Sequence, residues 1–338
     1  MMTKRTYRTK NKKKISKAKH KSPSLISRVL SGMFTLALTG AMVYGLQSYS
    51  SSDLSFVQVS DVHFSTRNVN TSFKLTADSP RILDDVVEQI NETPNLNFVM
   101  FTGDLIDRPF EKELNAVLPH IEKIQYPWYF VFGNHDPCIG GFLTKKVYMD
   151  ILKAHNENFN FDKPYYSFSP RKGYKVIGLD TIITSRLTSN GEISREELGW
   201  LDNELKNSKN DIVLIFMHIP IIEPFPSAGH RLLNADEVQA VIEKYKNPIA
   251  VFQGHYHANK ITQHNNILYV NSPSLVSYPN AFRIINIKNE RKKVIFDIRQ
   301  KETRLSNIRS LSKIMVMNAS IYTGDDKDQS AVYEINKK

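Results

Sequence analysis

The chain has 338 residues, of which 41% are hydrophobic, so it can bury one large core, and a single domain with appendages is the expected organisation. Its formal charge of +11 arises at the N-terminal end, where residues 1–52 hold eleven Lys or Arg and no Asp or Glu. The remaining 34 of the 45 basic residues are balanced by 34 acidic ones. A neutral folded part argues against a DNA- or RNA-binding surface, which needs basic residues clustered on the domain itself.

The N-terminal end combines a basic tail with an uncharged segment. Residues 1–28 are too polar and self-repelling to bury a core, so we expect them to be disordered. Residues 29–46 carry no charge and are just long enough to cross a bilayer. Lys and Arg before this segment favour an N-terminus on the inner side. We expect a single-pass membrane anchor with the folded domain outside the cytoplasm; secretion after signal cleavage is the alternative.

The folded part begins after a linker at 47–55 and alternates strand and helix patterns, which is typical of an α/β domain with helices covering the sheets. In chain order we expect strands at 54–59, 97–101 and 128–132, joined by helices at 78–92 and 111–124, and a further strand at 212–217. Polar residues follow the carboxyl ends of these strands, where open α/β sheets collect their sites.

The second half of the chain has a different order of predicted elements. Residues 165–180 read as a hairpin leading into a strand, and Ser194 starts a helix over 193–208. The Pro- and Gly-interrupted loop 223–233 is long enough to border a site. The runs 267–273, 281–287 and 292–298 look like antiparallel strands that finish a second sheet. Residues 301–338 have no clear period and form a C-terminal extension of unknown role.

Five blocks pair an apolar run with metal-binding residue types: FVQVSDVH, FVMFTGD, YFVFGNHD, IVLIFMH and AVFQGHYH. Asp61 and His63 alternate, so both can point to the same side at a strand end, and Gly103 before Asp104 allows close backbone approach to an ion. Carboxylate, amide and imidazole donors in this number suit two metal ions that share one carboxylate. The chain therefore reads as a binuclear metal hydrolase. The candidate site residues are Asp61, His63, Asp104, Asn134, His135, Asp136, His218, His255 and His257.

Together these motifs resemble the calcineurin-like metallophosphoesterase superfamily, whose pattern is Asp-x-His, Gly-Asp, Gly-Asn-His-Asp, His and Gly-His-x-His in that order. The resemblance spans 56–286, and the helix LGWLDNEL before His218 looks most like the class III cyclic-nucleotide phosphodiesterase branch. The chain has HIPI where that branch commonly has a paired His-His-Pro-Pro. The resemblance implies a four-layer α/β sandwich over 56–300, with two mixed sheets face to face, flanking helices and a dimetal site at strand ends.

The resemblance also implies a role for each candidate residue. Asp61, His63 and His257 would hold one metal, Asn134, His218 and His255 a second, and Asp104 would bridge them. A bridging hydroxide would attack phosphorus, His135 would protonate the departing oxygen, and Asp136 would orient that imidazole. Without a thiolate ligand, the two divalent or mixed-valence ions could be Mn, Fe or Zn.

The natural substrate stays open. The anchor at 29–46 would direct the site to phosphoesters outside the cytoplasm, either small molecules or lipid head groups, and the sequence does not separate monoesters from diesters. One alternative is a membrane-tethered protein that binds a phosphorylated ligand without turnover; another is a cyclic-nucleotide phosphodiesterase facing the cytoplasm.

Three further residues have two interpretations or a bland one. Cys138 reads as an inert buried thiol. His230 could meet substrate or be an ordinary loop histidine, and Arg108 could touch phosphate or form an ion pair with Asp107 or its neighbours.

Overall fold

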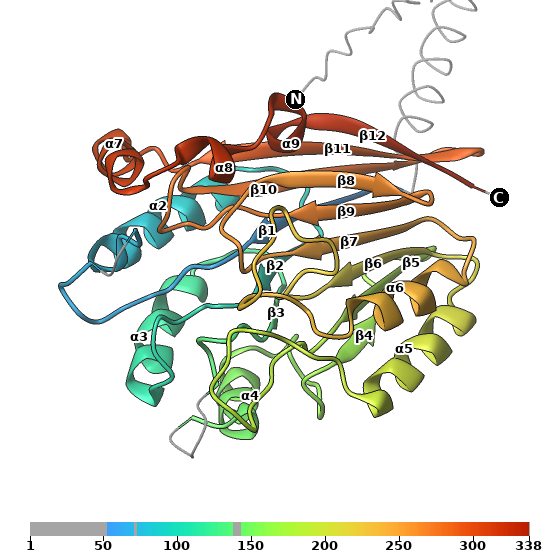
Figure 1. The fold of residues 1–338 in the computed structure, drawn as a ribbon, viewed down its shortest axis with the longest axis horizontal. Coiled ribbons are helices and arrows are strands. Elements are labelled where there is room, and N and C mark those ends of the chain that lie inside the picture. The colour runs from blue at the N-terminus through green and yellow to red at the C-terminus, as the bar shows by residue number, and fades with distance from the viewer. Residues whose placement is uncertain (1–52, 71–72, 138–142, 338) are drawn as a thin grey trace, which may run out of the picture. The chain divides into compact units, whose positions relative to one another are not determined.

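The computed structural model describes residues 53–70, 73–137 and 143–337 (Figure 1). Cys138, the basic tail at 1–28 and the expected membrane segment at 29–46 lie outside these ranges. Within them, no helix combines the length and the apolar character needed to cross a bilayer.

Two six-stranded mixed sheets form the centre of the fold (Figure 1). In spatial order, the first sheet consists of β12 (Ala331–Asn336), β11 (Lys293–Glu302), β10 (Ala281–Asn289), β1 (Leu54–Val59), β2 (Phe98–Thr102) and β3 (Trp128–Val131). The second consists of β4 (Tyr166–Phe168), β5 (Tyr174–Gly178), β6 (Ile212–Phe216), β7 (Ile249–Gln253), β9 (Ile267–Asn271) and β8 (Lys260–His264). Strands β1 to β3 run parallel, as do β5, β6, β7 and β9.

Helices flank this pair of sheets on both sides (Figure 1). They are η1 (Thr76–Asp78), α2 (Ser79–Asn91), α3 (Glu111–Ile121), α4 (Lys145–His155), α5 (Arg195–Asn207), α6 (Ala235–Glu243), α7 (Ser306–Met315), α8 (Ala319–Thr323) and α9 (Asp326–Gln329). Helices α2 and α3 are the crossovers of the parallel strands β1, β2 and β3, and each buries one apolar face. The expected four-layer α/β sandwich is confirmed.

Four phenylalanines show why the sheets pack face to face. Phe56 on β1 stacks on Phe98 of β2 with ring centroids 4.9 Å apart. Phe56 also meets Phe216 of β6 at 5.4 Å and Phe252 of β7 at 5.1 Å, both edge to face. Aromatic rings bury large apolar areas and favour this geometry, so the cluster joins the sheets behind the strand ends that carry the polar motifs.

Several expected elements are confirmed within a few residues. The helices expected at 78–92 and 111–124 correspond to α2 and α3, and the strand expected at 54–59 is β1. Ser194 caps α5, because its side chain accepts a hydrogen bond from the Glu197 backbone N–H at 3.1 Å. The hairpin expected over 165–180 is the antiparallel pair β4 and β5.

The assignment of the last strands to the second sheet was wrong for two of the three runs. Only the run at 267–273 lies there, as β9 between β7 and β8. The runs at 281–287 and 292–298 form β10 and β11 of the first sheet, where β10 pairs antiparallel with β1. Alternating apolar residues predict a strand but not its partner, and the side of β1 away from β2 was open for pairing.

The C-terminal extension is part of the fold. Residues 301–337 include α7, α8, α9 and β12, and β12 extends the first sheet by pairing antiparallel with β11. Arg283 on β10 is fully buried and donates hydrogen bonds to the backbone oxygens of Asp328 and Gln329, at 2.8 and 3.1 Å. These contacts fix the chain after α8 against β10.

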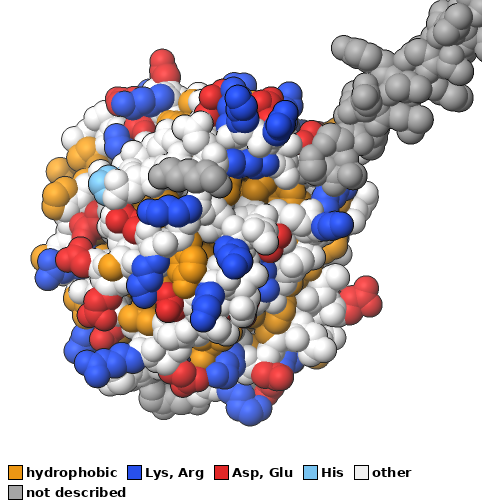
Figure 2. Space-filling view, turned by 90° about the vertical axis from the view of Figure 1, so that its right-hand side faces the viewer, with side chains coloured by type: hydrophobic (Ala, Val, Ile, Leu, Met, Phe, Trp, Pro, Cys, Tyr) orange, Lys and Arg blue, Asp and Glu red, His pale blue; other side chains and the backbone are white. Residues whose placement is uncertain are grey.

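The charges on one face of the molecule agree with the balanced count of basic and acidic residues in the folded part. On the face shown in Figure 2, Lys and Arg side chains are interspersed with Asp and Glu. The electrostatic fields of neighbouring opposite charges largely cancel within a Debye length. This face therefore offers no extended basic surface for a nucleic-acid backbone.

Candidate metal centre

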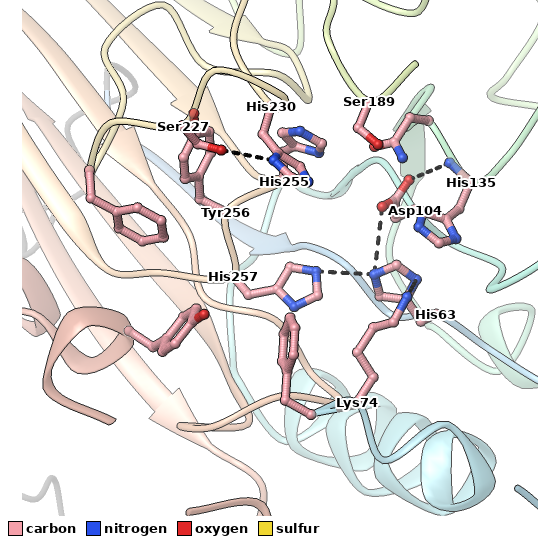
Figure 3. Close-up of a pocket in the computed structure, with 14 residues that line it drawn as sticks. His63, Lys74, Asp104, His135, Ser189, Ser227, His230, His255, Tyr256 and His257 are labelled. Atoms are coloured by element: carbon pink, nitrogen blue, oxygen red, sulfur yellow. Dashed lines mark hydrogen bonds and ion pairs between the residues drawn. The ribbon is translucent and has the colours of Figure 1, made fainter. Parts of the chain in front are cut away.

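The polar motifs converge because they all follow the carboxyl ends of parallel strands. Within the first sheet, Asp61 and His63 follow β1, Asp104 follows β2, and the Asn134-His135-Asp136 run follows β3. His218 follows β6, and His255 and His257 follow β7 of the second sheet. Since the sheets pack face to face with these ends on the same side, six of the nine candidates line a single pocket (Figure 3). The other three, Asp61, Asp136 and His218, are fully buried.

Tight backbone turns aim the side chains into this pocket. Asp61, His63, Asp104, His255 and His257 all have positive φ angles, between 43° and 74°. Residues with a Cβ rarely adopt this conformation, and hydrogen bonds hold it here: the Asp61 and His63 N–H groups donate to the Gly103 and Asp104 carbonyls at 3.1 and 2.9 Å. Such strain persists where the surrounding structure over-determines it, often at functional sites.

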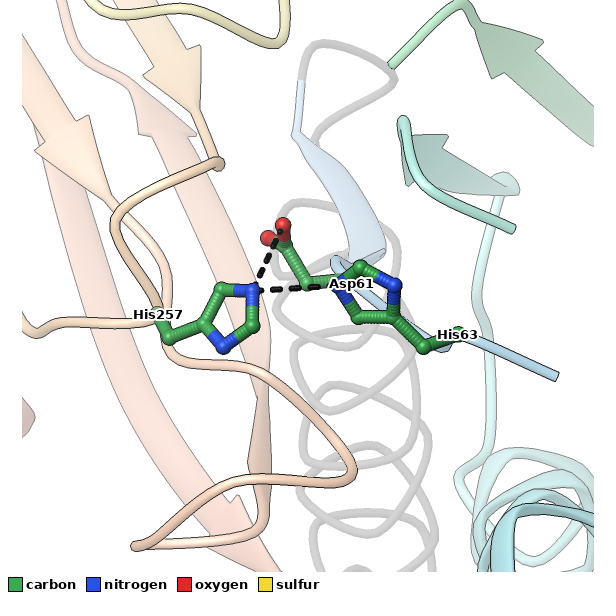
Figure 4. A group of neighbouring side chains, drawn as sticks. All are labelled: Asp61, His63 and His257. Carbon is green, nitrogen blue, oxygen red and sulfur yellow. Dashed lines mark hydrogen bonds and ion pairs between the residues drawn. The ribbon is translucent and has the colours of Figure 1, made fainter. Parts of the chain in front are cut away.

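Asp61, His63 and His257 form the first cluster (Figure 4). Nε2 of His257 lies 3.3 Å from Asp61 Oδ1 and 3.1 Å from His63 Nε2. Ser277 Oγ lies 2.9 Å from His257 Nδ1 and orients the ring from behind. All three side chains are at least nine-tenths buried, so the cluster lies in a largely water-excluded part of the pocket.

Asp104, His218 and His255 form the second cluster, which Asn134 joins. Nε2 of His218 lies 3.1 Å from His255 Nδ1 and 3.2 Å from Asn134 Oδ1. Nδ1 of His218 donates to the Thr102 carbonyl at 2.8 Å, so Nε2 is the nitrogen that faces the cluster.

Asp104 lies between the two clusters. Its Oδ2 is 3.5 Å from His63 Nε2 in the first cluster and 3.5 Å from His218 Nε2 in the second. Its Oδ1 accepts the His135 backbone N–H at 2.8 Å, which holds the carboxylate in place. A single carboxylate can therefore serve both clusters.

The donor set fits divalent cations. In each cluster two imidazole nitrogens approach within 3.1 Å, a separation at which two lone pairs repel unless a proton or a cation lies with them. Burial raises the pKa of Asp104, but the His218 imidazole more than offsets this and holds it well below its usual range. Burial lowers the pKa of His218, but Asp104 outweighs this and raises it to about 9. A cation that binds Nε2 of His218 would displace the proton that this ring carries at neutral pH.

Gly103 permits this arrangement, and replacing it by alanine is expected to disrupt it. Gly103 has a φ of +86°, and an added Cβ would lie 2.4 Å from His218 Nδ1 and 2.9 Å from the Gly133 Cα. We expect Gly103→Ala to lose at least about tenfold in Mn²⁺ affinity, because the displaced ring is a ligand candidate. Gly173→Ala is the matched control: φ is also +86° with nothing within 4 Å, so it should cost only about 1–2 kcal/mol of backbone strain. Equal affinities in a Mn²⁺ titration of both variants would contradict this assignment.

His135 adjoins both clusters: its ligand atom and those of His63 and Asp104 all lie within 4.8 Å of one another. Its ring centroid is 4.6 Å from that of His63, and its Nδ1 donates to the Asp107 carbonyl oxygen at 2.7 Å. The Asp107 side chain in turn accepts from Lys74 Nζ at 3.1 Å. The ring is thus oriented by a backbone carbonyl, and its position on the pocket leaves it available to a ligand.

The expectation that Asp136 orients the His135 imidazole was wrong. The Asp136 carboxylate is fully buried and accepts backbone N–H groups of Gly133, Asp104 and Leu105, at 2.8 to 2.9 Å. The Tyr148 hydroxyl also donates to it, at 3.2 Å. The side chain turns inward because these N–H groups need an acceptor where no water reaches. Asp136 therefore holds the turn that carries Asp104.

The pocket also contains residues that no motif indicated. Its volume is about 320 Å³. Besides six of the nine candidates, it is lined by Phe73, Lys74, Ser189, Phe225, Ser227, His230, Tyr256 and Tyr322. His230 thus lies in the pocket wall, whereas Arg108 forms an ion pair with Glu113. Only the Pro- and Gly-rich character of 223–233 had indicated a pocket loop; Lys74 and Tyr322 carry no sequence signal.

Known proteins are similar to the chain in sequence and in fold. The calcineurin-like phosphoesterase family model matches residues 54–259. A manganese-dependent ADP-ribose/CDP-alcohol diphosphatase of Oryza sativa is 27% identical, over 60% of this chain and 77% of its own. A 3′,5′-cyclic-nucleotide phosphodiesterase of Nostoc is 28% identical, over 65% and 78%. A probable glycerophosphodiester phosphodiesterase of Arcobacter nitrofigilis is 26% identical, over 64% and 77%.

A solved structure supports the fold independently. The dimetal phosphatase of Danio rerio superposes with a TM-score of 0.57 at 17% identity and covers 72% of this chain and 95% of its own. The family model accounts for more than half of the 338 residues. The chain belongs to the calcineurin-like phosphoesterase family and is a phosphoric ester hydrolase.

Proposed function

We propose that the chain hydrolyses phosphoesters with two divalent cations, one held by Asp61, His63 and His257 and the other by Asn134, His218 and His255, with Asp104 shared between them. The single observation that carries the proposal is the position of Asp104 Oδ2, 3.5 Å from one imidazole of each cluster. When bound, the cations supply Lewis-acid activation of the phosphoryl group and of the water nucleophile. Mn, Fe and Zn all suit a donor set without thiolate.

We assign His135 as the group that delivers a proton to the departing oxygen. Its Nδ1 is occupied by the Asp107 carbonyl, so Nε2 is the nitrogen free to face a substrate in the pocket. A positioned imidazole contributes about 10²- to 10⁴-fold to proton transfer at near-neutral pH. Lys74 also lines the pocket, where its ammonium group pairs with Asp107 at 3.1 Å.

The proposal predicts metal-dependent turnover. The chain, stripped of metal and refilled with Mn²⁺, should hydrolyse bis(p-nitrophenyl) phosphate or p-nitrophenyl phosphate, and His135→Ala should lower kcat about 10²- to 10⁴-fold while the metal content stays unchanged. Release of p-nitrophenolate and elemental analysis measure the two quantities. Two bound metals without turnover on either ester would favour the alternative of a phospho-ligand binding protein.

The relatives span three substrate classes at similar identity, so they leave the substrate open between nucleotide diphosphate compounds, cyclic nucleotides and glycerophosphodiesters. The activities of these three relatives nevertheless favour a substrate with two substituents on phosphorus, that is, a diester or diphosphate. The ratio of diester to monoester turnover in the same assay tests this preference.

We further propose that residues 29–46 anchor the chain in a membrane with the hydrolase domain outside the cytoplasm. The support is the charge-free run itself and the Lys and Arg before it. Deleting 29–46 should release the protein from the membrane fraction, and protease added to intact cells should digest the domain of the full chain. Protection of the domain in intact cells would favour the cytoplasmic cyclic-nucleotide phosphodiesterase; a shortened protein in the medium would favour secretion.

A further inference from the structure

One wall of the metal pocket is aromatic, and it consists of Phe73, Tyr322, Phe225 and Tyr256. The rings contact one another in a series that starts and ends at the metal clusters. The centroid separations are 5.6 Å for His257 to Phe73, 5.9 Å for Phe73 to Tyr322, 6.0 Å for Tyr322 to Phe225, 5.1 Å for Phe225 to Tyr256 and 5.6 Å for Tyr256 to His255. This aromatic wall is continuous.

Core packing does not account for the aromatic wall. None of its four rings belongs to the main hydrophobic core, and Phe73, Phe225 and Tyr322 remain partly exposed at the pocket. The rings come from four separate segments: the turn before η1, α8, the loop after β6 and the turn after β7. Partly exposed aromatic rings that converge on one cavity provide contact area for a ligand at little cost in conformational entropy.

The other side of the pocket is polar. Asp104, His135 and Ser189 lie there, away from Tyr256 and Ser227 (Figure 3). A phosphoester with its phosphorus at the clusters would place its organic group along the aromatic wall. A polyol such as glycerol would lose hydrogen bonds to water against these rings, whereas a planar ring gains contact. The volume of about 320 Å³ suits a compact group.

We propose that the aromatic wall binds a planar ring carried by the phosphoester, a nucleobase or another aryl group, and that Tyr322 of the C-terminal extension is its specificity-determining residue. This inference rests on the proposed function, because it takes the clusters as the phosphoryl site. Tyr322 lies beyond the 54–259 region matched by the family model, so the extension supplies a pocket wall that the family motifs do not encode.

The structure holds Tyr322 firmly in place. Its carbonyl accepts the Asn259 N–H at 2.9 Å, two residues after His257. The following helix α9 is tied to the same strand region, because Asp328 accepts the Ile261 N–H at 3.0 Å and pairs with Lys260 Nζ at 3.2 Å. The ring is therefore positioned relative to the metal clusters rather than carried on a free end of the chain.

The test compares three methyl phosphodiesters on the Mn²⁺-loaded full chain: the esters of adenosine, of ribose without a base, and of octanol. We expect kcat/KM for the adenosine ester to exceed that of the base-free ester about tenfold or more, the scale of one base stacked on aromatic side chains. Tyr322→Ala should remove most of this ratio, and Tyr322→Phe should retain it. Phe110→Ala, which removes an exposed ring outside this pocket, is the control.

Each outcome decides a separate question. Hydrolysis of all three esters at ratios that Tyr322→Ala does not change would overturn the inference and leave the proposed function intact. Preference for the octyl ester would overturn it in favour of an alkyl ligand. If no ester is cleaved, the proposed function fails, and calorimetry then compares the binding of adenosine 5′-monophosphate with that of ribose 5-phosphate. Tighter binding of adenosine 5′-monophosphate that is lost in Tyr322→Ala supports the inference. Equal binding of the two ligands overturns it.

Discussion

Replacing Asp104 by asparagine is expected to abolish turnover, with a loss of about 10³-fold or more in kcat. The substitution keeps the shape and the Oδ1 that accepts the His135 N–H at 2.8 Å, so the fold should survive. It removes the negative charge from Oδ2, which lies 3.5 Å from both His63 Nε2 and His218 Nε2. Without that charge, the residues of the two clusters would hold two cations less tightly, and elemental analysis should find less than the wild-type metal content.

The matched control for this variant is Asp180→Asn. Asp180 is similarly buried, at 9% exposed, and pairs with Lys145, but it does not line the pocket. It should retain metal and turnover even if its melting temperature falls. An Asp104→Asn variant with wild-type kcat and metal content would show that the shared position of Asp104 has no role in catalysis.

Replacing Arg283 by methionine is expected to lower the free energy of unfolding by about 3–5 kcal/mol. The guanidinium is fully buried, and its Nη2 donates to Asn259 Oδ1, Asn271 O and Asp328 O at 2.7, 3.0 and 2.8 Å. Burial lowers the pKa of Arg283 to about 10, so the group stays charged at neutral pH. Methionine fills part of the volume but leaves these acceptors without donors, and each buried unsatisfied acceptor costs about 1–3 kcal/mol.

Urea denaturation measures this loss, and Arg304→Met is the control. Arg304 pairs with Glu88 and Glu92 at the surface, where an ion pair contributes about 0–1 kcal/mol. Since Arg283 also ties the segment after α8 to β10, limited proteolysis should cut Arg283→Met first between residues 319 and 330. Equal stability of the two variants would show that the buried network contributes no more than a surface pair.

The metal-binding residue types were predictable because their motifs are local. Asp61 and His63 are two residues apart, and so are His255 and His257, and the buried strands before them were readable as apolar runs. A strand end with alternating polar residues places side chains at a known point of a parallel sheet, so the convergence of five such ends on a shared site followed from the α/β pattern.

The role of Asp136 was not predictable from the same local reasoning. It is next to His135 in the sequence, yet its carboxylate accepts backbone N–H groups from the Gly103–Ile106 turn of another strand. Which buried donor needs an acceptor depends on where two turns meet, and this is a property of the packed sheets. The pairing of β10 with β1, and of β11 with β10, has the same origin, because apolar alternation does not encode the partner strand.

The sequence by itself determined the family, the α/β class and the set of residues that could bind metal, because residue type, strand pattern and motif order are written along the chain. The tertiary structure decided that Asp104 lies between two imidazole clusters. It also placed Lys74 next to His63 and Asp107 next to His135. Tyr322 reaches the pocket from the C-terminal part of the chain. Such contacts join residues far apart in sequence. They depend on sheet order and on packing between elements, which local propensity and periodicity do not encode.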